Sequence, residues 1–439
     1  MRVLIIGSGG REDAFAWKFQ KEDKVSHIMI CPGHKGMKRF EKVELWESSL
    51  LGNYSSLAQK AVEKEIDLVV CGPEAPLTEG LAKFFEDQSI PFFGPSESAA
   101  LLEGSKIFSK EFMREFEIPT AGFQVFDRYE DAVAGLEAWP VSSGIVIKAD
   151  GLAGGKGVVV TTDREVAQKT LFDFMKNPEV SIHSDRILFE HILPGEEVSA
   201  FALCNGEEFF FLGTACDHKR VFDYDEGPNT GGMGCYRDPL WPDADLKEKI
   251  IHKVLIPTLK GMKERGHPFK GILFMGLMIN SMNEPFVIEY NVRFGDPEAQ
   301  TLLPLIKGEL AVALHQLSTQ AKIKTPLSLS EETSVHVVMT SGGYPSITKD
   351  KPMSLNHKIE IPFLTHEDQP LLFLAGVNRN EDGQYINTGG RVLGVTAVSE
   401  ELETARQMAY KGIEMIHFKD SHYRTDIAFN RRGGLKSDQ

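Results

Sequence analysis

The chain has 439 residues, of which 42% are apolar and 25% are charged, a composition typical of a globular protein with several hydrophobic cores. This length favours about three domains. The formal net charge is −15, from 63 acidic and 48 basic residues. Such a balance argues against a broad nucleic-acid or acidic-membrane surface, because phosphate backbones attract dense positive charge. We therefore expect no nucleic acid and no membrane as partner, and local cations at any anionic ligand.

The cysteines and the hydropathy indicate the compartment. Five cysteines are widely scattered and form no C-x-x-C pair, which predicts neither a disulfide framework nor a zinc site and favours a reducing environment. No apolar run approaches the roughly 20 residues of a membrane span, and the amino-terminal apolar stretch is too short for a signal peptide. We expect a cytoplasmic protein.

Roughly the first hundred residues alternate between short apolar strands and helical segments, the pattern of a parallel sheet wound on both faces. The G-S-G-G-R-E turn after the first strand is similar to a phosphate-binding glycine loop at a helix start. A nicotinamide dinucleotide site is disfavoured, because a third glycine and an acidic residue at the end of the second strand are missing. We expect strands at Val3–Ile6, His27–Cys31, Asp67–Cys71 and Pro91–Phe93, and helices at Ser55–Lys64 and Leu77–Asp87.

The rest of the chain mixes helices with many strands. Ser98–Phe116 is expected to form one amphipathic helix, and the Asn205-Gly206 pair predicts a hairpin between two apolar strands. Further helices are expected at Leu246–Glu264 and Glu400–Ile416. Expected strands are GIVIKAD, GVVVTT, RILFEHI, GILFMGLMI, PFVIEYNV, VHVVMT, LLFLAGV and GGRVLGVTAV.

The run I-K-A-D-G-L-A-G-G-K-G-V-V-V carries the first chemical signal. Glycines from Gly151 to Gly157 let backbone N–H groups approach phosphate oxygens, while Lys148 and Lys156 can neutralise their charge. The run is not a Walker P-loop, because Gly157 occupies the position of the Mg²⁺-binding Ser or Thr. It joins two strands, so we interpret it as a flap over a nucleotide; a plain glycine-rich hairpin is the alternative.

The strand V-I-E-Y-N-V-R-F carries the second signal. Glu289, Asn291 and Arg293 alternate onto one face, because side chains of a strand repeat every two residues. Carboxylate and amide oxygens without a nearby His or Cys favour Mg²⁺ or Mn²⁺ over zinc, and the guanidinium suits the phosphates that the ion bridges. A solvated strand face is the alternative.

Two polar segments complete the set. D-H-K-R-V-F-D-Y-D-E-G-P-N-T-G-G-M-G begins at Asp217, which could hold an ammonium, while Lys219 and Arg220 could hold a carboxylate or a phosphate. A solvated loop is the alternative. In E-H-I-L-P-G-E-E-V-S, a connecting segment could offer backbone groups to a nucleotide base, and Glu190 and Glu197 are candidates for the ribose.

Together these motifs resemble the ATP-grasp ligases, and among them the glycinamide ribonucleotide synthetase (phosphoribosylamine–glycine ligase) family. The resemblance covers nearly the whole chain in order, and G-P-N-T-G-G-M-G with R-F-G-D-P-E is its most specific part. The other matching motifs are GSGGRE, GPEAPLTEG, EGSK, IKADGLAGGKGV, PGEEVS, SGGYP, GGRVLGVTA and YRTDI. The resemblance implies an N-terminal doubly wound α/β domain at 1–102, a two-lobe ATP-grasp core at 103–325 with a flap subdomain at about 120–190, a β-rich C-terminal domain at 326–427, and a tail at 428–439.

The resemblance also implies roles for single residues. Lys106 and Lys148 would contact the ATP phosphates, Glu197 the ribose, and Glu289 with Asn291 the Mg²⁺ or Mn²⁺ ion. The lid and the adenine segment would be Gly151, Gly154, Gly155, Lys156, Gly157, Glu190, His191 and Ile192. Catalytic roles would fall to Lys148, Arg293, Asp217 and Lys219. Substrate contacts would fall to Gly9, Gly10, Glu74, Pro76, Asp217, Lys219, Arg293, Gly295 and Asp296.

The implied reaction belongs to purine biosynthesis and uses small-molecule substrates. ATP phosphorylates the carboxylate of glycine to glycyl phosphate, and the amine of 5-phosphoribosylamine then attacks, giving glycinamide ribonucleotide, ADP and phosphate. We expect a monomer or a small homo-oligomer.

The sequence departs from the family pattern at three positions. Asp13 stands where a histidine is usual, His34 where an asparagine is usual, and His191 where a glutamate is usual. The first two lie near the expected ribose-phosphate site. Two alternatives therefore stay open: another ATP-grasp carboxylate–amine ligase that uses a different amine, and a non-catalytic nucleotide-binding protein.

Overall fold

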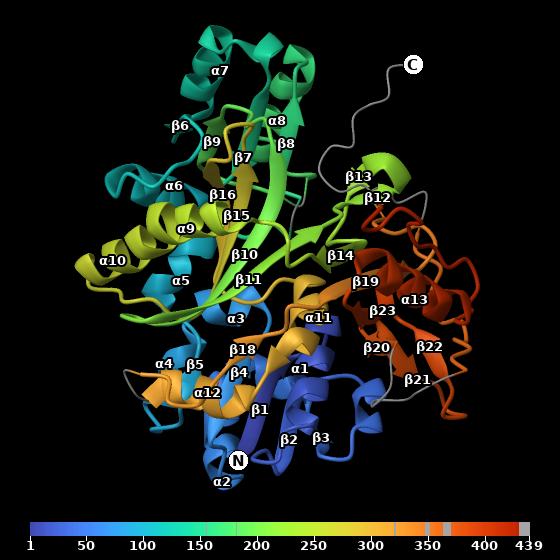
Figure 1. The fold of residues 1–439 in the computed structure, drawn as a ribbon. Coiled ribbons are helices and arrows are strands. Elements are labelled where there is room, and N and C mark those ends of the chain that lie inside the picture. Colours follow the sequence, from blue (N-terminus) through green and yellow to red (C-terminus); the bar gives the residue numbers. More distant parts are fainter. Residues whose placement is uncertain (155, 181, 320–321, 347–351, 363–369, 430–439) are drawn as a thin grey trace.

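The computed structural model describes the chain except for residues 155, 181, 320–321, 347–351, 363–369 and 430–439. The N-terminal part lies at one end of the molecule and a small lobe built from β6–β9, α7 and α8 at the other (Figure 1). A long curved sheet runs between them and continues into the C-terminal part. None of the helices in the described ranges is long and apolar enough to cross a membrane.

The N-terminal sheet confirms the predicted doubly wound α/β fold. Its parallel strands follow the order β3-β2-β1-β4-β5. Alternate side chains of β1 feed two cores: Val3 and Ile5 pack with α1, whereas Leu4 and Ile6 pack with α2 and α4. The elements are β1 Arg2–Gly7, α1 Gly10–Gln20, β2 His27–Pro32, β3 Val43–Leu45, α2 Tyr54–Glu63, β4 Leu68–Cys71, α3 Glu74–Thr78, α4 Leu81–Glu86 and β5 Phe92–Phe93.

Two predicted helices are each broken in the structure. The expected helix Leu77–Asp87 was wrong: α3 ends at Thr78, and Gly80 has a left-handed φ of 81° before α4 begins. The expected single helix Ser98–Phe116 was also wrong, because α5 (Glu97–Gly104) and α6 (Lys106–Glu115) are separated by an extended residue, Ser105. The hydroxyl of Ser105 accepts from Phe108 N–H at 3.1 Å, so it caps α6 and starts a new helix.

The small lobe is an antiparallel sheet in the order β6-β9-β7-β8, with a core of its own. Helices α7 and α8 cover one face and bury Leu136, Leu171 and Phe189. β7 and β8 are consecutive, so the glycine-rich run joins two strands as predicted. The elements are β6 Phe123–Phe126, α7 Tyr129–Ala138, β7 Ile145–Ala149, β8 Val158–Thr161, α8 Arg164–Met175 and β9 Ile187–Glu190.

The long sheet has the order β16-β15-β10-β11-β14-β19-β23-β20. The hairpin predicted at Asn205-Gly206 is confirmed, since Cys204 pairs with Phe209 across it. The sheet passes without interruption from β14 to β19, so the predicted boundary at 325/326 divides one continuous sheet and stays a prediction. The strands are β10 Glu196–Asn205, β11 Phe209–Asp217, β12 Arg220–Phe222, β13 Glu226–Asn229, β14 Gly234–Arg237, β15 Lys270–Ile279, β16 Pro285–Asn291, β17 Ile306–Lys307, β18 Ser328–Leu329, β19 Thr333–Thr340, β20 Leu371–Leu374, β21 Val377–Arg379, β22 Tyr385–Asn387 and β23 Arg391–Ser399.

Helices cover this sheet and tie it to the N-terminal part. The predicted helix Leu246–Glu264 is present, with a π-helical turn at Ile251–Leu255 in its middle. Helix α12 packs in the same core as β1 and α1, so residues beyond 300 complete the N-terminal domain. The helices are α9 Ala244–Ile250, α10 Ile256–Glu264, α11 Glu298–Leu302, α12 Leu310–Thr319 and α13 Leu402–Glu414.

Candidate active site

A buried cluster of two lysines and a glutamate lies where the small lobe meets α6. Lys148 on β7 and Glu190 on β9 share one face of the lobe sheet, and Glu190 Oε1 lies 2.8 Å from Lys148 Nζ. Glu190 Oε2 lies 2.9 Å from Nζ of Lys110. All three residues are at most 4% exposed, so the cluster carries one net positive charge away from bulk water. Unpaired buried charge is costly, and such a surplus favours an anionic ligand.

Lys110 was missed in the sequence. Its one available signal was position, because it follows Lys106 by four residues and therefore shares a face of α6. Its ammonium group also donates to Thr120 Oγ1 at 2.6 Å, and Thr120 in turn donates to Val287 O. Burial lowers the pKa of Lys110 to about 8, although the carboxylate of Glu190 opposes that shift.

The start of the flap is anchored on the break between α5 and α6. Asp150 accepts from Ser105 Oγ at 3.0 Å and from Ile107 N–H at 3.1 Å, and Lys106 Nζ donates to Gly151 O at 2.6 Å. Burial lowers the pKa of Lys106, against the opposing influence of Glu289. The broken helix thus brings Lys106 to the flap, which an uninterrupted helix would not do.

Among the remaining described flap residues, Gly157 is buried, and a Cβ on it would lie 2.7 Å from Ala153 Cβ, whereas the others are more open. Gly151 and Gly154 have positive φ values of 89° and 54°, and a Cβ on either would touch nothing within 4 Å. Lys156 is exposed. The predicted contact Gly155 lies outside the described residues. The flap therefore has backbone conformations that favour glycine.

Glu289 and Asn291 lie on one face of β16, as predicted. Burial alone would raise the pKa of Glu289, but Lys219, Lys148 and Lys106 around it lower that pKa below its ordinary value. The Oδ1 atom of Asn291 accepts from Arg293 at 3.0 Å. In the described part of the chain, no group of three or more His, Cys, Asp or Glu residues could hold a metal. The pair fits a divalent ion that keeps water and substrate phosphates as its other ligands, as Mg²⁺ does.

Arg293 joins the predicted substrate residues to this face. Its NH2 group donates to Glu103 Oε1 at 2.8 Å, and its Nε lies 3.4 Å from Glu74 Oε2. Glu103 also accepts from the N–H of Val292 at 2.8 Å, so it fixes both the strand and the guanidinium. Pro76 is buried on α3, the same short helix as Glu74. Glu103 was missed in the sequence, although it opens the E-G-S-K motif.

A second group of charges surrounds Asp217 at the end of β11. Its Oδ1 atom is buried and has no hydrogen-bond partner among the described residues. Burial and the nearby Glu298 raise the pKa of Asp217 well above its usual range. Glu298 is 3% exposed and accepts from Ser199 Oγ at 3.1 Å. Lys219 forms an ion pair with Glu197, and Glu197 and Glu289 outweigh burial to raise the pKa of Lys219.

Close backbone approach brings the two most specific motifs together here. Gly232 has φ 112°, and a Cβ on it would lie 2.4 Å from Pro297 Cδ and 2.7 Å from Asp217 Oδ1. A Cβ on Gly295 would lie 2.1 Å from Glu298 Oε2. These positions therefore need glycine, because a side chain would collide with the carboxylates. Glu298 was missed in the sequence, where it closes R-F-G-D-P-E.

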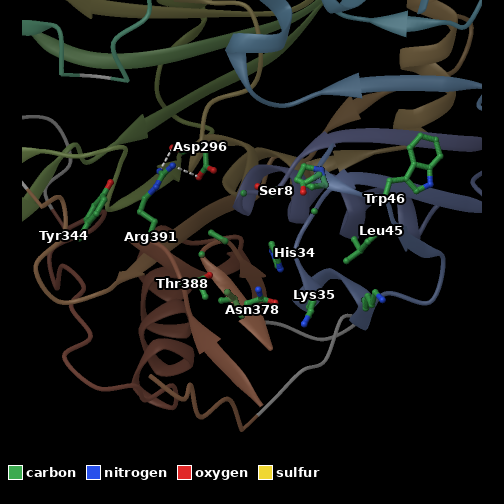
Figure 2. A pocket seen from close by; sticks show the side chains of 18 residues that line it. Ser8, His34, Lys35, Leu45, Trp46, Asp296, Tyr344, Asn378, Thr388 and Arg391 are labelled. Atoms are coloured by element: carbon green, nitrogen blue, oxygen red, sulfur yellow. Dashed lines mark hydrogen bonds and ion pairs between the residues drawn. The ribbon is translucent and has the colours of Figure 1, made fainter. Parts of the chain in front are cut away.

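A cavity of about 710 Å³ lies between the N-terminal and C-terminal parts (Figure 2). Ser8, His34 and Lys35 come from the N-terminal side, and Thr388 and Arg391 from the C-terminal side. Predicted substrate residues Gly9 and Asp296 line it as well. Arg391 NH2 lies 3.3 Å from Asp296 Oδ1; burial alone would raise the pKa of Asp296, but Arg391 and Arg11 lower it. Sequence reasoning gave no role to Arg391, because only the fold brings β23 here.

The glycine turn before α1 is partly occupied by carboxylates of the chain itself. Glu12 Oε2 accepts from Gly9 N–H at 2.5 Å, and Asp296 Oδ2 accepts from Arg11 N–H at 3.4 Å. A Cβ on Gly10 would lie 2.5 Å from Gln300 Nε2, so this glycine permits close packing against α11. One donor of the helix start is therefore taken by Glu12 of the same helix, and the other docks Asp296.

The predicted adenine segment lies at the end of β9. His191 N–H donates to Gly122 O at 3.0 Å, and its ring stacks on Trp139 with 4.4 Å between centroids. The side chain of Ile192 is 38% exposed. The segment thus presents an apolar side chain beside the buried Glu190.

A small antiparallel lobe packs beside a larger sheet, and lysines and the strand with Glu289 lie between them. This arrangement defines an ATP-grasp protein, and comparison with known protein families agrees. Residues 1–103, 104–299 and 334–430 match the profiles of the N, ATP-grasp (A) and C domains of phosphoribosylglycinamide synthetase. The chain belongs to this family, the phosphoribosylamine–glycine ligases, whose ATP-grasp chemistry uses ATP with a divalent metal.

Individual relatives cover nearly all of the chain. It is 37% identical over 431 residues to phosphoribosylamine–glycine ligase of Leptospira interrogans, covering 98% of both chains. It is 39% identical to the bifunctional purine biosynthetic protein of Pichia angusta but spans only 53%, about half, of that protein's length. The crystal structure of the Thermotoga maritima phosphoribosylamine–glycine ligase matches with a TM-score of 0.81 at 32% identity, covering 97% of this chain and 100% of that one.

A pH-dependence follows from the shared glutamate. If bound phosphates draw Lys148 away from Glu190, the carboxylate of Glu190 is neutralised only by the protonated Lys110. Nucleotide binding therefore favours the protonated form of Lys110. The affinity for the nucleotide falls as the pH rises and Lys110 loses its proton. We expect the KM for ATP to rise about tenfold between pH 7.5 and 9.5. Lys110→Arg should remove most of this rise, because arginine stays charged.

Steady-state kinetics across this pH range measure the effect. Lys83→Met, at a surface lysine paired with Asp87, is the matched control and should keep the wild-type profile. An unchanged alkaline rise in Lys110→Arg would show that another group titrates.

Proposed function

We propose that the chain ligates glycine to 5-phosphoribosylamine, using ATP with Mg²⁺ or Mn²⁺, and releases glycinamide ribonucleotide, ADP and phosphate. The observation that carries this proposal is the convergence of Lys106, Lys148 and Lys219 on Glu289, whose pKa these three cations lower. Such a group of cations beside an ionised carboxylate suits a metal-bound triphosphate. Membership of the family supports the choice of substrates.

The nucleotide would lie between the small lobe and the long sheet. Lys106 and Lys148 would hold phosphate oxygens, Glu197 the ribose, and the segment from Glu190 to Ile192 the adenine. Glu289 and Asn291 would hold the divalent ion, which neutralises charge on the phosphates when bound. The 3.4 Å contact of Lys148 Nζ with Ile288 O, next to Glu289, supports its role at the phosphates.

The chemistry needs these cations because a carboxylate is a poor electrophile. Transfer of the γ-phosphoryl group to glycine converts a carboxylate oxygen into a phosphate leaving group. Lys148, Lys219 and Arg293 would offset the charge that develops during both steps. The Gly151–Gly157 flap would exclude water, which otherwise hydrolyses an acyl phosphate.

Glycine would bind beside the end of β11. Asp217 and Glu298 form a buried acidic pair, and an ammonium group would compensate their charge. Lys219 would face the carboxylate that is to be phosphorylated. The small space around Gly232 and Gly295 would leave no room for a larger amino acid.

The cavity between the N-terminal and C-terminal parts would hold 5-phosphoribosylamine. Lys35, Lys38 and Arg391 supply positive charge for its phosphate, and Asp296 can accept hydrogen bonds from its amine or hydroxyl groups. Asp296 lies in the same short segment as Glu298, so the amine would be directed toward the activated glycine. A volume of about 710 Å³ is ample for a phosphorylated pentose.

A coupled assay of ADP release tests the reaction. We expect release to depend on both glycine and 5-phosphoribosylamine, and hydroxylamine to trap glycyl phosphate as a hydroxamate. A panel of other amines tests the alternative ligase that the departures at Asp13 and His34 leave open. ATP binding without turnover under saturating substrates would instead support a non-catalytic protein.

Two variants test the charge cluster. Lys148→Ala and Glu289→Ala should fold normally but lose roughly 10²–10³ in kcat, or about 3–4 kcal/mol of transition-state stabilisation, because each loses one positioned charge. Circular dichroism checks the fold and the ADP assay the rate. Lys169→Ala, at a surface lysine paired with Asp173, should be unaffected. Near-wild-type rates in either active-site variant would refute its role.

Two further variants test the glycine pocket. Asp217→Asn and Glu298→Gln each remove one of the two carboxylates that the ammonium group of bound glycine would face, so the KM for glycine should rise on the order of 10²-fold. The KM for ATP should stay within about threefold, since the nucleotide would not touch these groups. Equal increases in both constants would point to a general distortion and remove the ammonium assignment.

A further inference from the structure

The cavity shown in Figure 2 has two walls that come from distant parts of the chain, so its shape depends on how those parts dock. His34 and Ser8 belong to the N-terminal wall. The opposite wall includes the stretch 375–378, which directly follows Leu374, the last residue of β20. Whatever fixes Leu374 therefore fixes the start of that wall.

Asp13 and Arg39 hold the backbone at Leu374 and two residues before it. Asp13 lies on α1 and is fully buried, and Arg39 NH1 donates to its Oδ1 at 2.7 Å, while NH2 contacts Oδ2. Asp13 Oδ2 accepts from the N–H of Leu374 at 2.9 Å. Arg39 NH2 also donates to Leu372 O at 3.2 Å. One buried ion pair thus holds two positions of β20.

His34 completes the set from the N-terminal wall. Its Nε2 lies 3.1 Å from Leu374 O, and an N–H there donates to this carbonyl. Burial lowers the pKa of His34, which keeps the ring neutral near pH 7 with its proton on Nε2. Both backbone polar groups of Leu374 are therefore held by N-terminal side chains. Asp13 and His34, the two departures from the family pattern near this site, meet at a single residue.

We propose that Asp13, Arg39 and His34 form a clamp on Leu374 that positions the C-terminal wall of the cavity for the phosphorylated amine substrate. Asp13 and Arg39 are positioning residues, since they act through the 375–378 stretch, whereas His34 both contacts Leu374 and lines the cavity itself. The inference rests on the proposed function, which assigns that substrate to this cavity. Loss of a clamp that serves only folding would raise the KM values of all three substrates alike, whereas loss of a positioning clamp would raise the KM of one substrate.

Asp13→Asn is the sharpest change, because it removes the charge and keeps the shape. We expect the KM for 5-phosphoribosylamine to rise at least about tenfold, while kcat and the KM values for ATP and glycine stay within about twofold. Glu22→Gln is the matched control. Glu22 follows the same helix, is also buried, and accepts from the backbone N–H groups of Leu310 and Ala311, away from the cavity. It should change the melting temperature only.

Milder variants keep the test decisive if Asp13→Asn folds poorly. His34→Ala should raise the same KM several-fold, and His34→Gln, which retains an N–H donor, should restore it. Amide hydrogen exchange should report faster exchange at Leu374 in both Asp13→Asn and His34→Ala. Calorimetry with ribose 5-phosphate should show weaker binding to these variants.

The outcomes separate the clamp from the proposed function. Equal increases in all three KM values, or unchanged ribose 5-phosphate binding despite faster exchange at Leu374, would overturn the clamp. If the wild-type protein turns over a different amine, the proposed function fails, and the same KM comparison with that amine still decides the clamp.

Discussion

The arrangement of the site depends on carboxylates that pair with its lysines, and in the proposed reaction phosphates would replace these partners. Glu190 lies between Lys110 and Lys148, and Glu197 pairs with Lys219. Buried ammonium groups without partners would lose their protons, because desolvation disfavours the charged form. A chain with a net charge of −15 can thus concentrate positive charge at one point. In the proposed reaction the same pairs would open on binding, so part of the phosphate interaction would replace contacts that exist already.

Small irregularities of the backbone aim these charges. The break at Ser105 starts a new helix and turns Lys106 toward Gly151. The pairing of β15 with β16 shifts between Gly276 and Leu277, which leaves Ile288 as an extra residue with its carbonyl toward Lys148. A bulge frees a backbone group that a regular ladder would use. Regular elements would therefore have placed both lysines elsewhere.

The sequence predicted the features that depend on a local residue pattern and missed those that depend on the docking of distant segments. Alternation along one strand was enough to place Glu289 and Asn291 on one face of β16, and the glycine run was correctly placed between two strands. Arg293 lies beyond the end of that strand, yet it donates to Asn291 Oδ1. The break at Ser105 was missed, because the amphipathic pattern continues across it. Arg391 and Arg39 were missed for another reason: Arg391 meets Asp296, 95 residues away, and Arg39 meets Leu372, 333 residues away, only after distant segments have packed. No local spacing records such contacts.

The segment after β16 links the two halves of the site. Arg293 reaches back to Asn291 at the metal face, Asp296 pairs with Arg391 at the cavity, and Glu298 lies beside Asp217. Three residues within a six-residue segment, 293–298, therefore lie beside the groups that the proposed function assigns to the phosphates, the amine and glycine. Because β16 and α11 hold this segment at both ends, Arg293, Asp296 and Glu298 keep fixed positions relative to one another. In the proposed reaction the activation site and the amine cavity would share this one support, whereas the clamp on Leu374 would act on the opposite wall of the cavity and leave the support unchanged.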